Sequence, residues 1–262
     1  MELWFDEVGV VGGPTVVLLP DASTPAVAWP ADLLEGLMAA RCRVIRVDLA
    51  DQGRSTTGPA GSFGELVEAV ALVVEQVGGV AGAVTLVGHG FGGTLALALT
   101  QARPGAVSQL LMVSSTGWYA DPTVAGPDEA VVVGLIWRNR MGLNQQHPQR
   151  ALARELRLAW PPDGAPSRDE LLAEAERWHD WGWNPRDDHR VLWLAAPPLW
   201  SAMAQVSCPV AVLHGALDPI VPIDHGRRLA ALCPSAAYVE LSGSAHALDS
   251  GLVGAILAVV AP

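Results

Sequence analysis

The sequence is poor in cysteine and in positive charge, and both shortages limit what the protein can be. Only three cysteines occur among 262 residues, and their spacing fits no metal-binding pattern. We therefore expect reduced thiols in packing roles, as in cytoplasmic proteins. Basic residues number 16 against 27 acidic ones, for a net charge of −11. This balance argues against nucleic acid and anionic membranes as partners and favours a small neutral molecule.

Targeting and membrane signals are also missing. The first residues include early acids and no basic segment, so we expect no secretory signal peptide. Residues 76–102 carry no formal charge and are long enough to raise the question of a membrane span. Their many glycines and their changes of hydrophobic period predict a buried strand, a turn and a helix instead.

Short apolar runs alternate with helical patterns along most of the chain. Strands are expected at residues 15–19, 43–47, 83–87, 107–113, 210–213 and 237–241. Helices are expected at about 30–40, from a capping box at 62–65 to near 76, at 92–102 and beyond 248. Near-continuous apolar strands separated by helices predict a mostly parallel sheet with helices on both faces.

This alternation stops near residue 117, and tryptophan becomes frequent. Residues 118–204 hold eight of the ten tryptophans, together with helical patterns and a second capping box at 167–170. We predict a core domain of residues 1–116 and 205–262 with an inserted helical cap at 117–204. The tryptophans either pack the cap helices or line a pocket for a flat hydrophobic ligand.

Three histidines of the insertion, His147, His179 and His189, have no metal-binding spacing. We expect them at the surface, and we expect the protein to use neither a metal nor a cofactor.

The segment Gly88–Gly92 follows a predicted strand and opens a predicted helix. A nucleophile elbow reads G-x-S-x-G in this context, because flanking glycines permit a sharp turn. This chain has Gly90 in the serine position and so cannot form the usual acyl-enzyme. The segment also fits an ordinary glycine-rich turn. A dinucleotide-binding loop with G-x-G-x-x-G spacing is disfavoured, because that loop normally follows the first strand.

Two more polar residues follow predicted strands. Asp218 lies in the turn after strand 210–213, and His246 follows strand 237–241. The order elbow, acid, histidine is that of the α/β-hydrolase fold. Singly, Asp218 could cap a turn and His246 could be a loop histidine, but three such elements in order favour a shared site. We expect the two side chains to be hydrogen-bonded and Gly90 to have a positive φ.

Short stretches near both ends of the chain carry a family resemblance: Glu2–Trp4, Trp29–Pro30, Val44–Asp48, Gly53–Thr57, Phe63–Leu66, Val87–Gly88, Asp218–Ile220, His225–Gly226, Leu229–Ala230 and His246–Leu248. Over about 1–115 and 205–262 the sequence resembles the aclacinomycin methylesterase family, which acts on anthracycline polyketides. The resemblance implies an α/β-hydrolase fold with an inserted cap and a hydrophobic, aromatic substrate. It also implies an oxyanion hole formed by the N–H groups of Ala22 and Phe91.

Two departures from the family pattern bear on the chemistry. The nucleophile position is Gly90, and the chain reads Pro20–Ala22 where many relatives read His-Gly-x. Asp21 therefore either places a negative charge beside the oxyanion hole or faces away and caps its loop. Gly90 is either an engineered replacement that inactivated a serine esterase or a natural divergence. The change at Pro20–Ala22 favours divergence, since an inactivating replacement would not explain it.

Three hypotheses remain open from the sequence. The first is an enzyme in which His246, oriented by Asp218, performs acid–base chemistry without a serine: cyclisation, elimination, rearrangement or water-assisted hydrolysis. The second is a methylesterase or carboxylesterase inactivated at Gly90. The third is a non-catalytic ligand-binding protein. In each, the expected contacts to the ligand come from Asp21, Ser23, His89, Trp118, Trp137 and Trp183.

Overall fold

One mixed sheet organises the molecule. The computed structural model describes residues 1–55, 58–78, 84–140, 147–186 and 188–261, except for the side chains of 135–140. Within these ranges the strands are β1 (Phe5–Gly9), β2 (Thr15–Leu19), β3 (Arg43–Val47), β4 (Val84–His89), β5 (Val107–Val113), β6 (Val210–Gly215) and β7 (Ala237–Leu241). They form a 7-stranded sheet in the order β1-β3-β2-β4-β5-β6-β7. Only the β1–β3 pairing is antiparallel.

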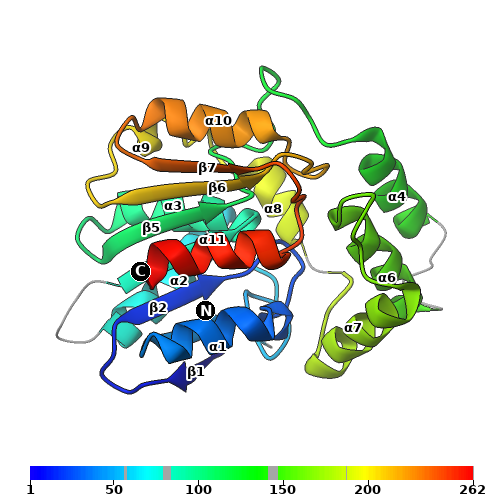
Figure 1. The fold of residues 1–262 in the computed structure, drawn as a ribbon, viewed down its shortest axis with the longest axis horizontal. Helices are drawn as coiled ribbons and strands as arrows, with labels where there is room; N and C mark the ends of the chain where they lie inside the picture. The colour runs from blue at the N-terminus through cyan, green and yellow to red at the C-terminus, as the bar shows by residue number, and fades with distance from the viewer. Residues whose placement is uncertain (56–57, 79–83, 141–146, 187, 262) are drawn as a thin grey trace.

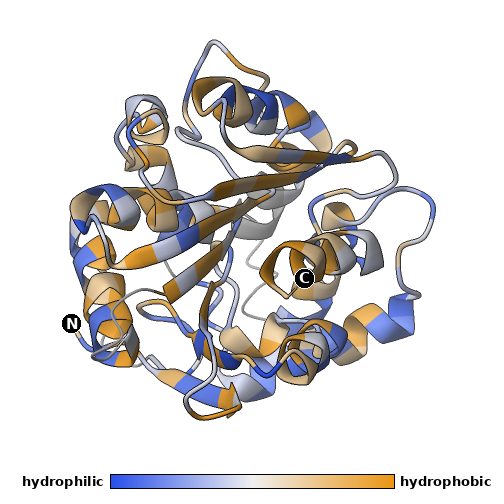
Figure 2. Ribbon diagram, turned by 60° about the vertical axis from the view of Figure 1, so that its left-hand side comes forward, coloured by the Kyte–Doolittle hydropathy of each residue, from blue (hydrophilic) through white to orange (hydrophobic). Residues whose placement is uncertain are grey.

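Helices cover both faces of the sheet, as the apolar strands predict (Figure 1). One face carries α1 (Ala31–Ala39) and α11 (Ser250–Val260); the other carries α2 (Phe63–Gly78), α3 (Phe91–Ala102) and α10 (Ile223–Leu232). Alternation along β2 serves both layers, because Val16 and Leu18 pack toward α1 while Val17 and Leu19 pack toward α2 and α3. Figure 2 shows the strands largely in the colours of hydrophobic residues.

The insertion between β5 and β6 has two parts. Helices α4 (Glu129–Arg140), α6 (Pro148–Ala159) and α7 (Arg168–Trp181) stand beyond the end of the sheet (Figure 1). A small core that includes Trp178 and Trp183 joins α6 to α7. Helices α8 (His189–Ala195) and α9 (Trp200–Met203) instead pack into the main core through Trp193 and Trp200. The expected cap at 117–204 is thus a projecting layer followed by a segment that belongs to the core by its packing.

The expected strands all occur, and β4 and β6 each run two residues past their expected ends. The capping box at 167–170 is complete, with reciprocal hydrogen bonds between Ser167 and Glu170. At 62–65 only half of the box forms, because the Glu65 carboxylate accepts from the Gly61 N–H. Strand β1 was not predicted; it is a short, partly exposed edge strand with little apolar signal.

The charge-free segment contains β4 and α3 over residues 84–102, with 79–83 outside the described residues. In the described part of the chain, no helix is both long and apolar enough to cross a bilayer. The cysteines are free thiols; Cys42 and Cys233 are buried and Cys208 is half-buried.

Candidate active site

The elbow between β4 and α3 has the backbone geometry of a nucleophile position. Gly90 adopts φ 51° and ψ −118°, which confirms the predicted positive φ. Its N–H donates to the Val113 carbonyl at 2.9 Å, and its carbonyl accepts from Ser115 Oγ at 2.6 Å. A Cβ at Gly92 would overlap the Leu19 carbonyl, so close packing of α3 on β2 requires glycine there. The turn is therefore built as an elbow, although its central side chain is absent.

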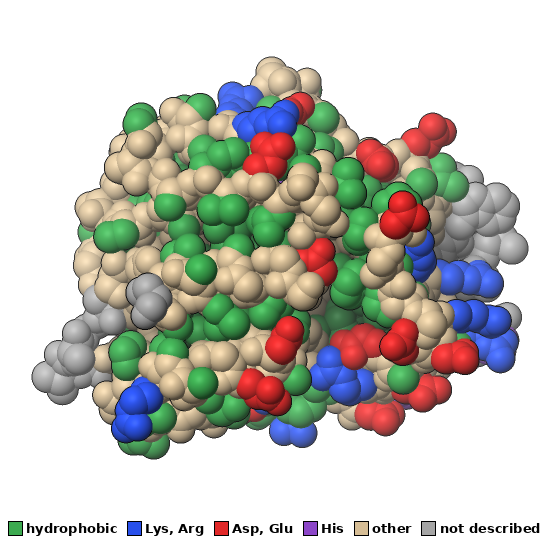
Figure 3. Space-filling model, in the orientation of Figure 1, with side chains coloured by type: hydrophobic (Ala, Val, Ile, Leu, Met, Phe, Trp, Pro, Cys, Tyr) green, Lys and Arg blue, Asp and Glu red, His purple; other side chains and the backbone are tan. Residues whose placement is uncertain are grey.

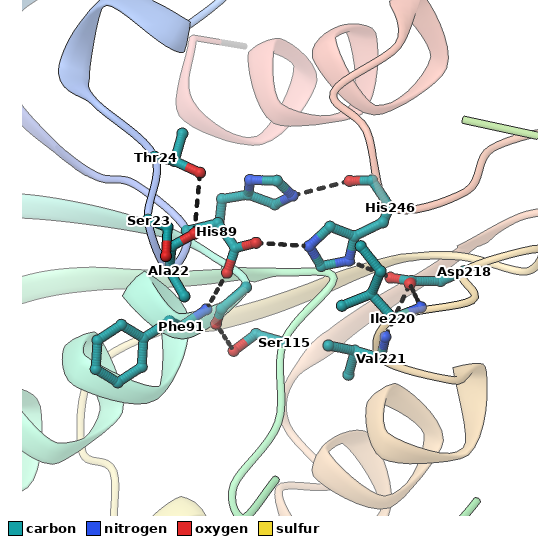
Figure 4. A network of polar contacts seen from close by, with 12 residues as sticks. Ala22, Ser23, Thr24, His89, Phe91, Ser115, Asp218, Ile220, Val221 and His246 are labelled. Atoms are coloured by element: carbon teal, nitrogen blue, oxygen red, sulfur yellow. Dashed lines mark hydrogen bonds and ion pairs between the residues drawn. The ribbon is translucent and has the colours of Figure 1, made fainter. Parts of the chain in front are cut away.

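The predicted dyad is present at the carboxyl end of the sheet (Figure 4). His246 Nδ1–H donates to Asp218 Oδ2 at 2.8 Å. The other oxygen, Asp218 Oδ1, accepts the N–H groups of Ile220 and Val221 at 2.8 and 2.9 Å. These bonds fix the carboxylate, so Asp218 can orient the imidazole and stabilise its protonated form.

A second carboxylate, that of Asp21, contacts the opposite side of the imidazole. His246 Nε2–H donates to Asp21 Oδ2 at 3.0 Å, and Asp21 Oδ1 accepts the Phe91 N–H at 2.7 Å. A Cβ built on Gly90 would overlap Oδ1 and Cγ of Asp21. Asp21 thus faces inward and fills the space of the missing elbow side chain.

The expected oxyanion hole is occupied in this arrangement. The Phe91 N–H, which the sequence assigned to a substrate oxyanion, already donates to Asp21. Ala22 is buried and lines the adjacent cavity. The hole therefore binds an internal carboxylate, and a substrate oxyanion could use the Phe91 N–H only if Asp21 moved away.

The side chains of Asp218, His246 and Asp21 form a hydrogen-bonded array, and the members of this array set one another's charges. Burial disfavours the His246 cation, but the charges of Asp218 and Asp21 and their hydrogen bonds outweigh it and raise the His246 pKa to about 10. Burial likewise opposes ionisation of Asp21, but the hydrogen bond and charge of His246, aided by the Phe91 N–H, hold the Asp21 pKa well below its usual range. At neutral pH the site therefore contains an imidazolium between two carboxylates.

His89 packs against this array as a neutral side chain. Burial and the charge of His246 lower the His89 pKa to about 4. The rings of His89 and His246 lie 4.7 Å apart, centroid to centroid. His89 Nε2–H donates to the His246 carbonyl at 2.8 Å, so its Nδ1 is an acceptor. This bond fixes the loop that carries His246.

A cavity of about 1010 Å³ opens above the array, between the sheet edge and the projecting helices. Asp21, Ala22, Ser23, His89 and His246 line it, as the sequence predicted for this edge. Asp21 rather than Gly90 forms the floor. In Figure 3, hydrophobic side chains are visible in the recess between the sheet domain and the projecting helices. The aromatic lining is Trp29, Tyr119, Trp160, Trp178, Trp183 and Trp193.

The tryptophans expected to contact the ligand differ in their positions relative to the cavity. Trp183 lines the cavity. Trp118 does not, because it packs half-buried against the main core; this expectation is wrong. The Trp137 side chain lies outside the described residues.

The loop that carries Asp21 is held by residues from the distant insertion. Ser23, at φ 59°, donates its N–H to His189 Nδ1 at 3.2 Å and accepts Trp183 Nε1–H at 3.1 Å. His189 Nε2–H donates to the Ala50 carbonyl at 2.6 Å. His189 is fully buried, so its expected surface location is wrong. No local signal could have revealed this, since its partners lie more than 100 residues away.

His147 and His179 are exposed, as expected. Among the described residues, no group of three or more His, Cys, Asp or Glu side chains is placed to hold a metal ion. At the sheet edge the polar side chains that line the cavity include Asp21, His89 and His246, and charged side chains of the insertion also line it.

Comparisons with known proteins agree with the fold. Residues 16–252 match the family described as alpha/beta hydrolase family. The chain is 27% identical to the rhodomycin D methylesterase DnrP of Streptomyces peucetius, over 94% of this chain and 89% of that protein. It is 28% identical to rhodomycin D methylesterase DauP of Streptomyces sp. (strain C5), with the same coverage.

Solved structures share the fold at low sequence identity. The esterase RhEst1 of Rhodococcus sp. ECU1013 matches with a TM-score of 0.80 at 21% identity, over 98% of this chain and 92% of that one. The enol-lactonase of Burkholderia xenovorans LB400 matches with a TM-score of 0.76 at 20% identity, over 98% and 94%.

Proposed function

The chain belongs to the alpha/beta hydrolase family, and we propose that it is an enzyme of that family that performs acid–base chemistry without a serine acyl-enzyme. Its substrate would be a neutral, hydrophobic, polycyclic molecule of the aromatic polyketide kind. The observation that carries this proposal is the imidazole of His246, held between Asp218 and Asp21 beside a vacated nucleophile position.

Acyl transfer needs groups that this site does not offer. Gly90 supplies no hydroxyl, and the Phe91 N–H is bonded to Asp21. In a working serine hydrolase, loss of the nucleophile costs about 10⁶ in kcat. A carboxylate at the anion-binding position also opposes negative charge on a substrate oxygen. Reactions in which that oxygen gains a proton are favoured instead: cyclisation, elimination or rearrangement, with water-assisted hydrolysis as the hydrolytic member of the class.

The cavity supports a large aromatic substrate. Its 1010 Å³ exceed what a small acyl ester needs, and tryptophans from the insertion form much of its wall. Indole faces offer wide, flat apolar contact with a single donor each. The names of the relatives support the same substrate class, because both are methylesterases of rhodomycin D.

An inactivated serine methylesterase is the second candidate, and the family relatives favour it. The overlap of any Cβ at position 90 with Asp21 argues against it, since a serine there would not fit the present site. A ligand-binding protein without turnover is the third candidate, and the large cavity is equally suited to this function.

One experiment separates these candidates. The wild-type protein and His246→Ala would be incubated with a panel of polycyclic aromatic polyketide ketones and their methyl esters, and products followed by mass spectrometry. The proposal expects conversion by wild type and a loss of about 10²–10⁴-fold in His246→Ala. Binding without conversion, seen as tryptophan fluorescence quenching that His246→Ala leaves unchanged, would support the ligand-binding alternative and overturn the proposal.

A further inference from the structure

The carboxylate of Asp21 stands where an elbow side chain would stand, but a different segment of the chain supplies it. Asp21 follows β2, whereas Gly90 lies between β4 and α3. One oxygen accepts the Phe91 N–H, where a serine hydrolase binds the oxyanion. The other contacts His246 Nε2, where a serine hydrolase has the serine hydroxyl. Glycine at 90 is what permits this, because any Cβ would overlap the carboxylate.

We propose that Asp21 is a catalytic residue that takes a proton from carbon in the substrate while His246 donates one to the substrate's carbonyl oxygen. This inference rests on the acid–base function proposed above and names the base. Both groups line the same cavity, so a ketone placed above them meets the carboxylate and the imidazolium side by side. The substrate class is a neutral ketone with a hydrogen on the carbon next to the carbonyl.

The first step balances within the pair. Asp21 Oδ2 takes the proton from the substrate carbon, and the C–H electron pair becomes the C=C bond of an enol. The carbonyl π pair takes the proton from His246 Nε2. Asp21 and His246 both end neutral, and the substrate is an enol without net charge.

Ring closure would then restore the site. The enol carbon attacks a second carbonyl of the same molecule and forms a C–C bond. That carbonyl oxygen takes the proton from Asp21, while the enol O–H returns its proton to His246. If the enol instead regains a proton on carbon from Asp21, the enol O–H returns its proton to His246, and the ketone and the charged pair are re-formed. In D₂O, a solvent deuteron that replaces the Asp21 proton while the enol is bound is carried to carbon by this return step. No external acid, base or oxidant is needed.

Burial makes the neutral pair accessible during this exchange. It opposes the charged form of both Asp21 and His246. His246 stays protonated because of the charges of Asp218 and Asp21, and Asp21 stays ionised because of His246 and the Phe91 N–H. When the substrate gives one proton to Asp21 and takes one from His246, two opposite charges therefore disappear from a buried site together. The Phe91 N–H meanwhile holds Asp21 Oδ1, so Oδ2 is the oxygen that faces the proton donor and the substrate.

The test uses 2-tetralone, an aromatic ketone with exchangeable C1 hydrogens, in D₂O. Proton NMR would follow loss of the C1 signal with wild type, Asp21→Asn, His246→Gln and Asp163→Asn. Asp163 is an exposed carboxylate that is not among the residues lining the cavity and serves as the charge control. We expect exchange above the buffer rate with wild type and Asp163→Asn, and about 10²–10⁴-fold slower exchange with the other two variants.

Chemical rescue distinguishes a base from a structural carboxylate. Asp21→Ala leaves space beside the Phe91 N–H, and added formate should restore part of the exchange in proportion to its concentration. Formate should not rescue His246→Gln. Asp21→Ala also serves if Asp21→Asn does not fold, as judged by thermal melting.

The outcomes separate this inference from the function on which it rests. If His246→Gln abolishes exchange while Asp21→Asn keeps it, Asp21 is not the base, and the acid–base function stands with His246. If formate fails to rescue a folded Asp21→Ala, the base role is likewise overturned. If wild type gives no exchange, or if neither variant changes it, both the inference and the acid–base function fail.

Discussion

Replacing Gly90 by serine should not by itself create an esterase. The new Cβ overlaps Asp21 Oδ1 and Cγ, so either the serine is forced out of place or Asp21 leaves its contacts with Phe91 and His246. Overpacking of this kind costs about 1–3 kcal/mol. In a chain of this length each kcal/mol lowers Tm by roughly 2–4 °C. We expect Gly90→Ser to melt several degrees below wild type and to leave simple esters unhydrolysed.

Adding Asp21→Gly to Gly90→Ser should convert the site into that of a serine esterase. The family resemblance implies glycine at this position, as the middle residue of a His-Gly-x motif, and the loss of the carboxylate frees the Phe91 N–H. A single oxyanion-hole donor contributes about 10²–10³ in kcat. The double variant should therefore hydrolyse 4-nitrophenyl butyrate at least about 10²-fold faster than Gly90→Ser alone, with the introduced hydroxyl placed beside His246.

The assay combines the release of 4-nitrophenol with labelling by an aryl phosphonate ester, and mass spectrometry locates the label at position 90. Asp21→Gly with Gly90 retained is the control and should give neither signal. Equal hydrolysis by Gly90→Ser and by the double variant would refute the reasoning, since Asp21 would then not fill the elbow position. A folded but inert double variant would show that the dyad is not arranged for a serine.

Other changes test the supports of the array. Asp218→Asn should lower the His246 pKa below about 10 and slow turnover about 10²-fold or more, measured as a pH–rate profile. Because folding raises the His246 pKa from 6.5 to about 10, its stabilisation is complete below pH 6.5 and is lost as pH rises through 10; Asp21→Asn should flatten that decline in urea unfolding. Trp183→Phe removes the donor to the Ser23 carbonyl and should cost about 0.5–1.5 kcal/mol of unfolding free energy, with equal melting curves as the contrary result.

The framework of the site could be predicted from the sequence because its signals are local. Gly90, Asp218 and His246 each follow a predicted strand within a few residues, and their order along the chain is that of the α/β-hydrolase fold. Parallel strands then bring their carboxyl ends to one edge, and the 2.8 Å contact of the dyad follows from this topology. The same locality explains why the capping box at 167–170 was found.

The orientation of Asp21 could not be predicted, because it depends on distant contacts. Ser23 in its loop is held by His189 and Trp183, each at least 160 residues away. A sequence pattern does not show which tryptophan meets a cavity and which packs on the core, so Trp118 was misplaced. The decisive feature, a carboxylate in the space freed at Gly90, appears only when two separate loops are seen together.

The protonation state of His246 tests the central claim most directly. Long-range ¹H–¹⁵N NMR spectra of the uniformly labelled protein would be recorded from pH 5 to 11, with the His246 signals assigned by their loss in His246→Gln. The imidazolium between Asp21 and Asp218 should keep both ring nitrogens protonated through pH 8 and titrate near pH 10, and Asp21→Asn should move that titration to lower pH. A His246 that titrates near 6.5 in wild type, unchanged by Asp21→Asn, would contradict the account.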